Sequence, residues 1–536
     1  MATFQLDDTE VPFEPGDTVL RAAHRAGMDI PHYCWHPGLS VAANCRMCLV
    51  ELMPPPGRQA MMLDVLRWDE ATQQYVKERK PKLVPACQQS ASAGMQVRSQ
   101  TSDYVSRARA SVQEFLLLNH PVDCPICDQA GECRLQDYWL SQGANKKRMN
   151  DEVVHKPKAV VFGPHIVYDA ERCIVCTRCV RVCDELAKDP VLSVTQRGNL
   201  NEIAVAPGRQ LDHNYTLMTE YVCPVGALTS KEFRFKARVW FLRSVRSVCV
   251  GCSKGCNSFT DYDPRDSKVY RYRPRENLNV NRYWMCDQGM LDYQRVHEGR
   301  VLEPTIGGET VPKRAALEKA AEVLREARAG KLAVVLGAQF SLEDNAALLA
   351  LAKKLGSSSF FESGLAAGMA DGILMEADKN PNSAGVRQLL GAEPKPFSEL
   401  AAGLKSGALT HVLSLGSSLK DPKQSELVAQ LPPHDSVVLS THDGVLMAGA
   451  KVVLPASSWA ESDGTFVNSA GLAQVSEQAI LPRGASLPAW KWVSHLARAL
   501  GHELNLKTVE EARRLFDAGP AINSQASAAQ TTESQP

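Results

Sequence analysis

The chain has 536 residues, which allows several domains that each bury a core of their own. Its 60 basic and 60 acidic side chains balance, so net charge gives no reason to expect a polyanionic partner such as nucleic acid. No basic and apolar leader opens the sequence, and no apolar run approaches the roughly 18 residues that cross a bilayer. We therefore expect a cytosolic chain whose contact with a membrane is through partners.

The first residues predict a small β-grasp domain. Residues 2–6 and 9–13 alternate apolar and polar side chains around a turn. Asp17 or Thr18 can then cap a short helix over residues 19–26. A hairpin followed by such a helix suits a β-grasp unit.

All sixteen cysteines precede Asp287, and fifteen of them fall into four sets that are spaced like metal ligands. In a reducing cytosol this pattern indicates metal ligation ahead of disulfide bonds. The half of the chain after Cys286 contains no cysteine. The sequence therefore predicts that metal ligation by cysteine is confined to the part of the chain before Asp287.

The first set is Cys34, a gap of ten residues, the pair Cys45 and Cys48, and a distant Cys87. Prolines and charges over residues 54–82 predict a surface insertion before the last of these cysteines. A long gap, a tight pair and a remote fourth thiolate follow the plan of a plant-type 2Fe-2S site, although the first gap exceeds the usual four residues. Four thiolates also suit a structural zinc ion, so both metals stay open at this point.

The second set follows a predicted helix. Residues 102–118 have helical periodicity and run into His120 and the proline after it, which ends the helix. Cys124, Cys127 and Cys133 leave a cluster one ligand short, and His120 is the nearest candidate for the fourth. An ordinary buried histidine would produce the same local pattern.

The third set is the strongest signal. Cys173, Cys176, Cys179 and Cys183 have the C-x2-C-x2-C-x3-C spacing of bacterial ferredoxins, in which the last cysteine serves another cluster and precedes a proline. Here the proline follows Cys223, and no second C-x2-C-x2-C run precedes that residue. We therefore expect one 4Fe-4S cluster on Cys173, Cys176, Cys179 and Cys223. Cys183 is then a leftover thiol, a relic or a packing residue.

Residues 233–241 alternate apolar with basic side chains and predict a strand with one solvated or anion-facing side. Thiolate clusters are net anionic, so positive charge nearby favours their burial. The basic residues of this region are candidates to face a cluster: Lys231, Arg234, Lys236, Arg238, Arg243 and Arg246.

The fourth set comprises Cys249, Cys252, Cys256 and, after a stretch rich in Arg and Tyr, Cys286. Zinc ribbons use related spacings, so this set alone does not choose between zinc and iron-sulfur. Three other sets in the same chain favour a 4Fe-4S cluster.

After Pro304 helical and strand-like patterns alternate, which predicts a parallel α/β layer. The predicted helices and strands cover residues 315–329, 332–336, 342–355, 412–415 and 437–440 in chain order. The small, polar residues from Gly519 onward predict a disordered tail.

Motifs for dinucleotide binding, phosphate binding and Ser/His/Asp catalysis are missing from the sequence. Several redox centres without a hydride or substrate site imply a conductor of electrons. The donor and acceptor chemistry is then expected in other subunits.

The run HPVDCPICDQAGECRLQDYW, the cysteine pattern before it and ERCIVCTRCVRVCDE after it closely resemble the large iron-sulfur subunit of respiratory complex I. The resemblance covers about residues 1–300. It implies a 2Fe-2S cluster on the first set, a 4Fe-4S cluster on the second with His120 as a ligand, and another on the third. Some bacterial members carry a further 4Fe-4S cluster off the main electron path, and the fourth set matches its ligands.

The second half resembles a reduced molybdopterin-oxidoreductase domain. The run VVLPASSWAESDGTFVNSAGLAQ carries its recognisable residues Glu461, Gly464, Thr465, Phe466, Asn468, Gly471 and Gln474. Leu472 stands where related sequences often have arginine, and no cysteine follows Cys286 to ligate molybdenum. The chain is also shorter than typical members in this half, so we expect no molybdopterin.

The expected fold is multidomain, combining α+β and α/β classes. Its predicted domains are a 2Fe-2S ferredoxin-like β-grasp domain (1–100), a 4Fe-4S domain (101–240), a molybdopterin-oxidoreductase-type 4Fe-4S domain (241–305), a reduced molybdopterin-oxidoreductase-like α/β domain (306–518) and a disordered tail (519–536).

The resemblance implies an electron-transfer subunit of a proton-translocating NADH:quinone oxidoreductase, with no catalytic residue in this chain. Its expected partners are an NADH- and FMN-binding flavoprotein subunit and smaller iron-sulfur subunits that lead to quinone. The expected location is peripheral, on the cytoplasmic side of the inner membrane, with only indirect contact to the membrane arm. Rival hypotheses are a subunit of an NAD-linked formate dehydrogenase or hydrogenase, and a zinc-stabilised scaffold or nucleic-acid-binding module.

Overall fold

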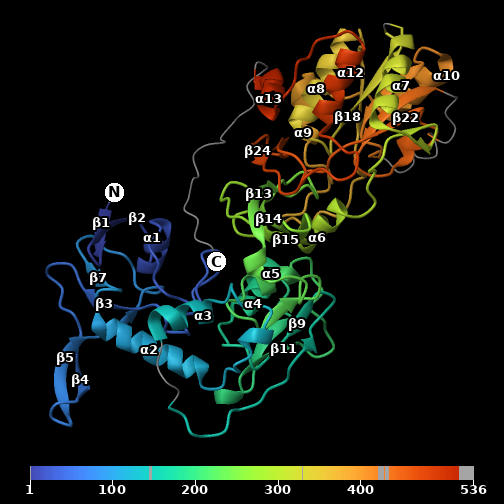
Figure 1. Cartoon of the computed structure of the whole chain (residues 1–536). Coiled ribbons are helices and arrows are strands. Elements are labelled where there is room, and N and C mark those ends of the chain that lie inside the picture. Colours follow the sequence, from blue (N-terminus) through green and yellow to red (C-terminus); the bar gives the residue numbers. More distant parts are fainter. Residues whose placement is uncertain (1, 144–147, 329, 421–427, 429–433, 518–536) are drawn as a thin grey trace. The chain divides into compact units, whose positions relative to one another are not determined.

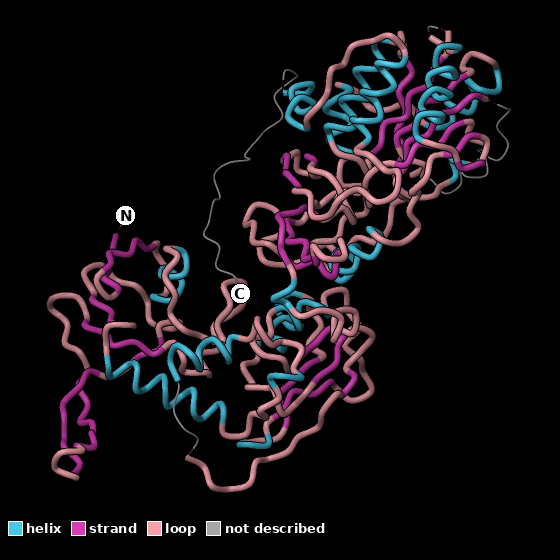
Figure 2. The backbone as a smooth tube through the Cα atoms, in the orientation of Figure 1, coloured by secondary structure: helices cyan, strands magenta, loops and turns pink. Residues whose placement is uncertain are grey.

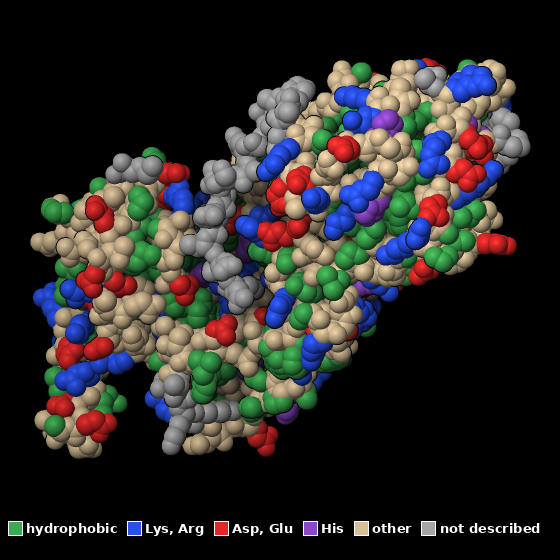
Figure 3. Space-filling view, turned by 45° about the horizontal axis from the view of Figure 1, so that its top comes forward, with side chains coloured by type: hydrophobic (Ala, Val, Ile, Leu, Met, Phe, Trp, Pro, Cys, Tyr) green, Lys and Arg blue, Asp and Glu red, His purple; other side chains and the backbone are tan. Residues whose placement is uncertain are grey.

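The computed structural model describes residues 2–143, 148–328, 330–420, 428 and 434–517, so the predicted tail (519–536) lies outside the described residues. The chain divides into two compact units at residues 240 and 241 (Figure 1). In each unit the basic and acidic side chains seen in Figure 3 are interspersed, in keeping with the balanced composition. Within the described ranges no helix is both long and apolar enough to cross a membrane.

The first unit begins with a small mixed sheet and one helix, as predicted. The strands are β1 (Ala2–Leu6), β2 (Thr9–Phe13), β3 (Leu49–Met53), β6 (Val84–Pro85) and β7 (Gln96–Arg98), in the order β2-β1-β7-β3-β6. Strands β1 and β7 run parallel, and the other pairs are antiparallel. Helix α1 (Val19–Arg25) is capped by Thr18 and shares one apolar core with the sheet. This arrangement is that of a β-grasp domain.

The predicted surface insertion is exposed but not irregular. Strands β4 (Met62–Asp69) and β5 (Gln74–Pro81) form an antiparallel ribbon, which Figure 1 shows projecting from the rest of the first unit. Trp68 and Tyr75 stack edge to face across it, with ring centroids 5.1 Å apart. The sequence pattern predicted the insertion but not this ribbon.

The remainder of the first unit is mostly loop between short elements (Figure 2). Helix α2 (Asp103–Leu117), capped by Ser102, confirms the helix predicted before His120. The other helices are α3 (Arg134–Tyr138), α4 (Arg178–Arg181), α5 (Thr216–Tyr221), the 3-10 turns η1 (Cys124–Ile126) and η4 (Gly198–Leu200), and the π-helical turns η2 (Trp139–Gly143) and η3 (Val182–Leu186). The strands are β8 (Val160–Val161), β9 (Ile166–Tyr168), β10 (Leu192–Thr195), β11 (Glu202–Val205) and β12 (Leu228–Ser230).

The strand predicted over residues 233–241 is wrong. This segment forms turns that end in the 3-10 turn η5 (Val239–Phe241), and the next strand begins at Arg243. Phe235 has a φ of 60°, a left-handed conformation that interrupts an extended chain. Its N–H donates to Asp128 Oδ1 at 2.8 Å. Tertiary contacts therefore override the alternating pattern here.

The second unit opens with an antiparallel sheet around the fourth cysteine set. Its strands are β13 (Arg243–Val248), β14 (Asn257–Asp263) and β15 (Lys268–Pro274), in that order. Helix α6 (Asp287–Leu291) and the 3-10 turn η6 (Asp292–Val296) follow.

The predicted parallel α/β layer is confirmed in the rest of the second unit. Its sheet has the order β17-β16-β22-β21-β20-β18-β19, and the strands from β22 to β19 run parallel. The strands are β16 (Thr305–Ile306), β17 (Glu309–Thr310), β18 (Leu332–Gly337), β19 (Ser359–Ser363), β20 (His411–Leu415), β21 (Asp435–Ser440) and β22 (Val452–Pro455), with a separate pair β23 (Gly464–Val467) and β24 (Ala473–Ser476). The helices are α7 (Lys313–Glu326), α8 (Leu342–Lys354), α9 (Ser383–Leu390), α10 (Phe397–Ser406), α12 (Ala489–Ala499), α13 (Val509–Asp517) and the 3-10 turn η7 (Val445–Met447).

Both faces of this parallel sheet are buried. In β18, Leu332, Val334 and Leu336 join the core formed with α7, α8 and α12. Ala333 and Val335 point to the opposite core, which contains α10. Burial on both faces explains the continuous apolar runs that marked these strands in the sequence.

Candidate metal centres

The first cysteine set meets between α1 and β3 and just after β6. The Cys34 and Cys45 side chains are hydrogen-bonded, Cys48 and Cys87 form a second such pair, and Cys34 also interacts electrostatically with Cys48. The contact with Cys45 lowers the pKa of the Cys34 thiol to about 5 against the effect of burial, helped by the backbone N–H groups of Cys45 and Asn44. The four predicted ligands therefore come together.

The second set brings Cys124, Cys127 and Cys133 within electrostatic reach of one another. His120 lies just past the end of α2, and burial lowers its pKa to about 4. Its Nδ1 atom is buried and has no hydrogen-bond partner among the described residues. Arg172 interacts with both His120 and Cys127. A neutral imidazole with an unused ring nitrogen, next to an arginine that also interacts with Cys127, fits a metal ligand.

The third set is Cys173, Cys176, Cys179 and Cys223. Cys179 interacts electrostatically with each of the other three, and burial raises the pKa of Cys173 to about 11. Because metal ligation requires thiolates, loading this site must release protons.

The loop that carries the third set has an unusual backbone. Val175 and Thr177 have φ values of 51° and 62°, in the left-handed region. Such conformations are costly for residues with a side chain and cluster at functional loops. The Val175 N–H donates to Cys173 Sγ at 3.4 Å, so the strained loop directs an N–H donor at a predicted ligand.

Cys183 has a partner of its own. It is fully buried, and its sulfur lies 3.3 Å from His213 Nε2. Burial, followed by the charge of Asp189, raises the pKa of this thiol to about 12. These contacts fit a packing residue, which was one of the two alternatives for this leftover thiol.

The fourth set is buried at all four positions, Cys249, Cys252, Cys256 and Cys286. Cys249 interacts electrostatically with the other three. A Cβ atom placed on Gly289 would lie 3.0 Å from Cys249 Sγ and 3.4 Å from Cys286 Sγ. Glycine thus keeps space free beside the sulfurs, which fits a site that holds a bulky group.

Two residues of the motif that resembles molybdopterin oxidoreductases support the loop of the fourth cysteine set. Gln474 Nε2 donates to the Gly255 carbonyl at 2.9 Å, and Asn468 Nδ2 donates to the Lys254 carbonyl at 3.4 Å. These bonds hold the turn between Cys252 and Cys256. In this structure Gln474 and Asn468 therefore hold the backbone of the loop between Cys252 and Cys256.

The three sites of the first unit share their loops. A Cβ atom at Gly226, three residues after Cys223, would come within 2.4 Å of Cys127 Sγ. Arg181 donates to the carbonyls of Cys34 at 2.5 Å and Cys176 at 3.3 Å. The second and third sites thus adjoin, as do the first and third.

The basic side chains near the cysteines are mostly not those that the sequence suggested. Arg238, one of the six candidates, donates to the carbonyls of Cys127 and Pro125. Arg172, Arg178 and Arg181 were missed, although each lies within two residues of a cysteine of the third set in the sequence. Arg178 is buried and donates to the Val222 carbonyl at 3.0 Å, next to Cys223.

A pocket opens at the C-terminal ends of the parallel strands in the second unit. Ser363 and Ser440 line it from the ends of β19 and β21, and Gly416 lines it just after β20, with Arg295 and His442 beside them. Such strand ends are the usual ligand position of α/β sheets. No cysteine is among its described lining residues.

Four family models match the chain in the order of these sites. They are a 2Fe-2S iron-sulfur cluster binding domain (residues 1–102), the NADH-ubiquinone oxidoreductase-G iron-sulfur binding region (109–148), the ferredoxin-like domain of NADH-quinone oxidoreductase subunit 3 (163–229) and molybdopterin oxidoreductase (378–499). The fold and sites define an iron-sulfur protein with 2Fe-2S and 4Fe-4S binding domains, joined to a molybdopterin-oxidoreductase-type domain.

Curated relatives give the particular family. The chain is 36% identical over 364 residues to the mitochondrial NADH dehydrogenase [ubiquinone] iron-sulfur protein 1 of Solanum tuberosum, covering 66% of this chain and 45% of that protein. It is 34% identical over 364 residues to the G subunit of the NADH-quinone oxidoreductase of Rickettsia felis, covering 67% and 50%. Over about two thirds of its length the chain is a homologue of this NADH-quinone oxidoreductase G subunit. It spans about half the length of these relatives.

A solved structure is also similar in part. A chain from the crystal structure of an NAD+-reducing [NiFe]-hydrogenase in the H2-reduced state aligns with 44% of this chain and 91% of its own length, at 30% identity and a TM-score of 0.36.

Proposed function

We propose that this chain is the electron-transfer subunit of a proton-translocating NADH:quinone oxidoreductase. The observation that carries the proposal is the adjacency of three cysteine-rich sites in one unit. The sulfur of Cys127 lies against Gly226 of the third site's closing loop, and Arg181 joins the loops of Cys34 and Cys176. A series of neighbouring redox sites without a substrate site suits conduction.

The proposed cofactors are one 2Fe-2S cluster and three 4Fe-4S clusters. The first set would hold the 2Fe-2S cluster, and the second set would hold a 4Fe-4S cluster with His120 as its nitrogen ligand. The third set, closed by Cys223, and the fourth set would each hold a 4Fe-4S cluster. When bound, such clusters supply one-electron transfer.

The protein's own residues set the environment of these sites. Most of the cysteines are buried, which limits their contact with water, and backbone N–H groups such as that of Val175 stabilise thiolate charge. Arg172, which interacts with Cys127, and Arg178, which interacts with Cys176, supply positive charge to the second and third sites. No residue of this chain is proposed to be catalytic.

Partners are proposed because the chemistry of the electron donor and of the electron acceptor would lie in other subunits. An NADH- and FMN-binding flavoprotein subunit would deliver electrons, and smaller iron-sulfur subunits would pass them to quinone. The chain would lie peripherally on the cytoplasmic side of the inner membrane, with indirect contact to the membrane arm and no role for nucleic acid. We further propose the domain boundaries given above and a domain after residue 305 that lacks molybdopterin and serves assembly or docking.

EPR spectroscopy of the assembled complex tests this proposal. NADH, added anaerobically, should reduce clusters whose signals disappear in variants of the corresponding cysteines. Reduction by dithionite but not by NADH would contradict the assignment. Formate-dependent reduction together with bound molybdenum or tungsten would favour a formate dehydrogenase subunit instead.

A further inference from the structure

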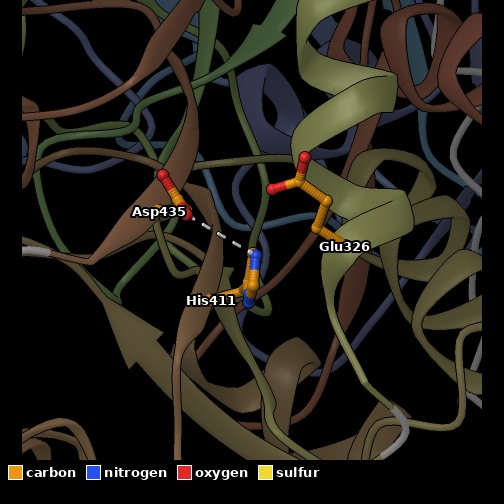
Figure 4. Close-up of side chains that lie close together, drawn as sticks. All are labelled: Glu326, His411 and Asp435. Carbon is orange, nitrogen blue, oxygen red and sulfur yellow. Dashed lines mark ion pairs between the residues drawn. The ribbon is translucent and has the colours of Figure 1, made fainter.

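A second kind of ligand cluster lies in the second unit, away from the cysteines. Glu326 is the last residue of α7, and His411 and Asp435 are the first residues of β20 and β21. Figure 4 shows the three side chains converging from these elements. One ligand atom from each lies within 4.8 Å of the others, and His411 Nε2 is 3.8 Å from Asp435 Oδ2.

The histidine of this cluster is buried and its Nε2 atom has no hydrogen-bond partner. His411 is 7% exposed, and Nε2 is buried without a hydrogen bond among the described residues. Its other ring nitrogen, Nδ1, lies 2.9 Å from Thr410 Oγ1. When Nδ1–H donates to that hydroxyl, the Nε2 lone pair faces two carboxylates. Three acceptors arranged in this way can be bridged by one cation.

The surrounding charges leave ligand atoms available. Lys451 Nζ lies 3.1 Å from Asp435 Oδ1, so that salt bridge uses one carboxylate oxygen and Oδ2 is the one facing the histidine. Lys319 interacts with both Glu326 and Asp435 at longer range but is paired with Glu322 at 2.6 Å. Glu326 is exposed at a helix end, so its side chain is free to adjust.

We propose that Glu326, His411 and Asp435 bind a divalent transition-metal ion, with Zn²⁺ as the best-suited ion. One imidazole and two carboxylates are ligands that zinc accepts at about 2.0–2.2 Å, with a water molecule in a fourth position. Such bonds place ligand atoms roughly 3.3 Å apart, so the cluster contracts on binding, chiefly by movement of Glu326.

The position of the site indicates a structural role. It lies at the N-terminal ends of β20 and β21, whereas the pocket described above lies at the C-terminal strand ends. A bound ion would tie the end of α7 to two neighbouring strands. Thr410 acts as a positioning residue, because its hydroxyl orients the imidazole.

Zinc binding by the full-length, cluster-loaded protein tests this site. Equilibrium dialysis against Zn²⁺ with metal analysis should find about one more zinc ion per chain in the wild type than in Glu326→Gln or His411→Gln. Glu326 is exposed, so its variant tests the site without disturbing a core. Glu318→Gln, an exposed glutamate on the same helix, is the matched control and should retain the ion. Any zinc held by the cysteines is the same in the wild type and in the three variants, so it cancels in the comparison.

Two further readouts complete the test. Zn²⁺ should raise the melting temperature of the wild type and of Glu318→Gln, but not that of Glu326→Gln. Thr410→Val should weaken zinc affinity by roughly 10- to 100-fold. Equal zinc content in the wild type and Glu326→Gln, or no zinc above the cysteine-bound background, would overturn the proposal.

Discussion

Gly226 lies directly against the sulfur of Cys127: a Cβ atom at position 226 would come within 2.4 Å of Cys127 Sγ. Gly226 follows Cys223, so the loop that carries the last cysteine of the third set also packs on the second set. We therefore expect the two sites to be coupled through this one residue, which lacks a side chain.

Gly226→Ala is expected to damage the second site. The added methyl group forces the sulfur or the loop to move, at a cost of about 1–3 kcal/mol typical of overpacking. EPR should show the signal of the second set lost or broadened, while the signal of the first set persists. Gly251→Ala is the control, because a methyl group added there would lie 3.6 Å from Cys249 Sγ, an ordinary van der Waals contact. Normal signals in Gly226→Ala would argue against the coupling.

His120→Cys is expected to keep a cluster with changed electronic properties. Replacing imidazole by thiolate adds negative charge, so the midpoint potential of that cluster should fall by on the order of 100 mV. Redox titration followed by EPR measures this shift, and other signals should persist. His155→Cys serves as control, because His155 is largely exposed and pairs with Glu171. An unchanged spectrum in His120→Cys would remove this histidine from the ligand set.

Cys183→Ser is expected to leave the iron content unchanged. The thiol contacts His213, so its loss should cost about 1 kcal/mol of stability. Cys223→Ser, by contrast, should lose about four irons, because it removes the proposed closing ligand. Metal analysis of the two purified variants decides between them, and the reverse result would make Cys183 the ligand.

The stability of the second unit should depend on Asp261 at acid pH. Burial alone would raise the pKa of this carboxyl, but Arg273 and Arg271 hold it well below its ordinary value. A depressed folded-state pKa means that the stabilisation is complete above about pH 4 and is lost as pH falls below that value. Asp261→Asn should cost about 3–5 kcal/mol near neutrality, because two arginines lose their buried partner, and the difference should shrink below about pH 4. Urea unfolding at several pH values measures this difference in the free energy of unfolding. Asp266→Asn, at an exposed position, is the control. A difference between the wild type and Asp261→Asn that stays constant with pH would contradict the prediction.

The sequence predicted which cysteines lie together, because ligand spacing within a short loop is a local property. The proline after Cys223 identified a distant residue that the structure does place beside Cys173, Cys176 and Cys179. The parallel α/β layer was also predictable, since its strands are continuous apolar runs buried on both faces.

Long-range contacts explain what the sequence did not predict. Arg181 reaches the carbonyl of Cys34 across 147 residues, which no local pattern encodes. The alternation over residues 233–241 predicted a strand, but Phe235 adopts a left-handed conformation and its N–H bonds to Asp128. The β4–β5 ribbon depends on cross-strand pairs such as Trp68 and Tyr75, which lie in a stretch whose prolines and charges suggested a loop.

Iron and acid-labile sulfide analysis of the anaerobically purified full chain tests the central claim most directly. One 2Fe-2S and three 4Fe-4S clusters predict about fourteen irons per chain and a matching amount of sulfide. A colourless protein that holds zinc at the cysteines and little iron would contradict the account.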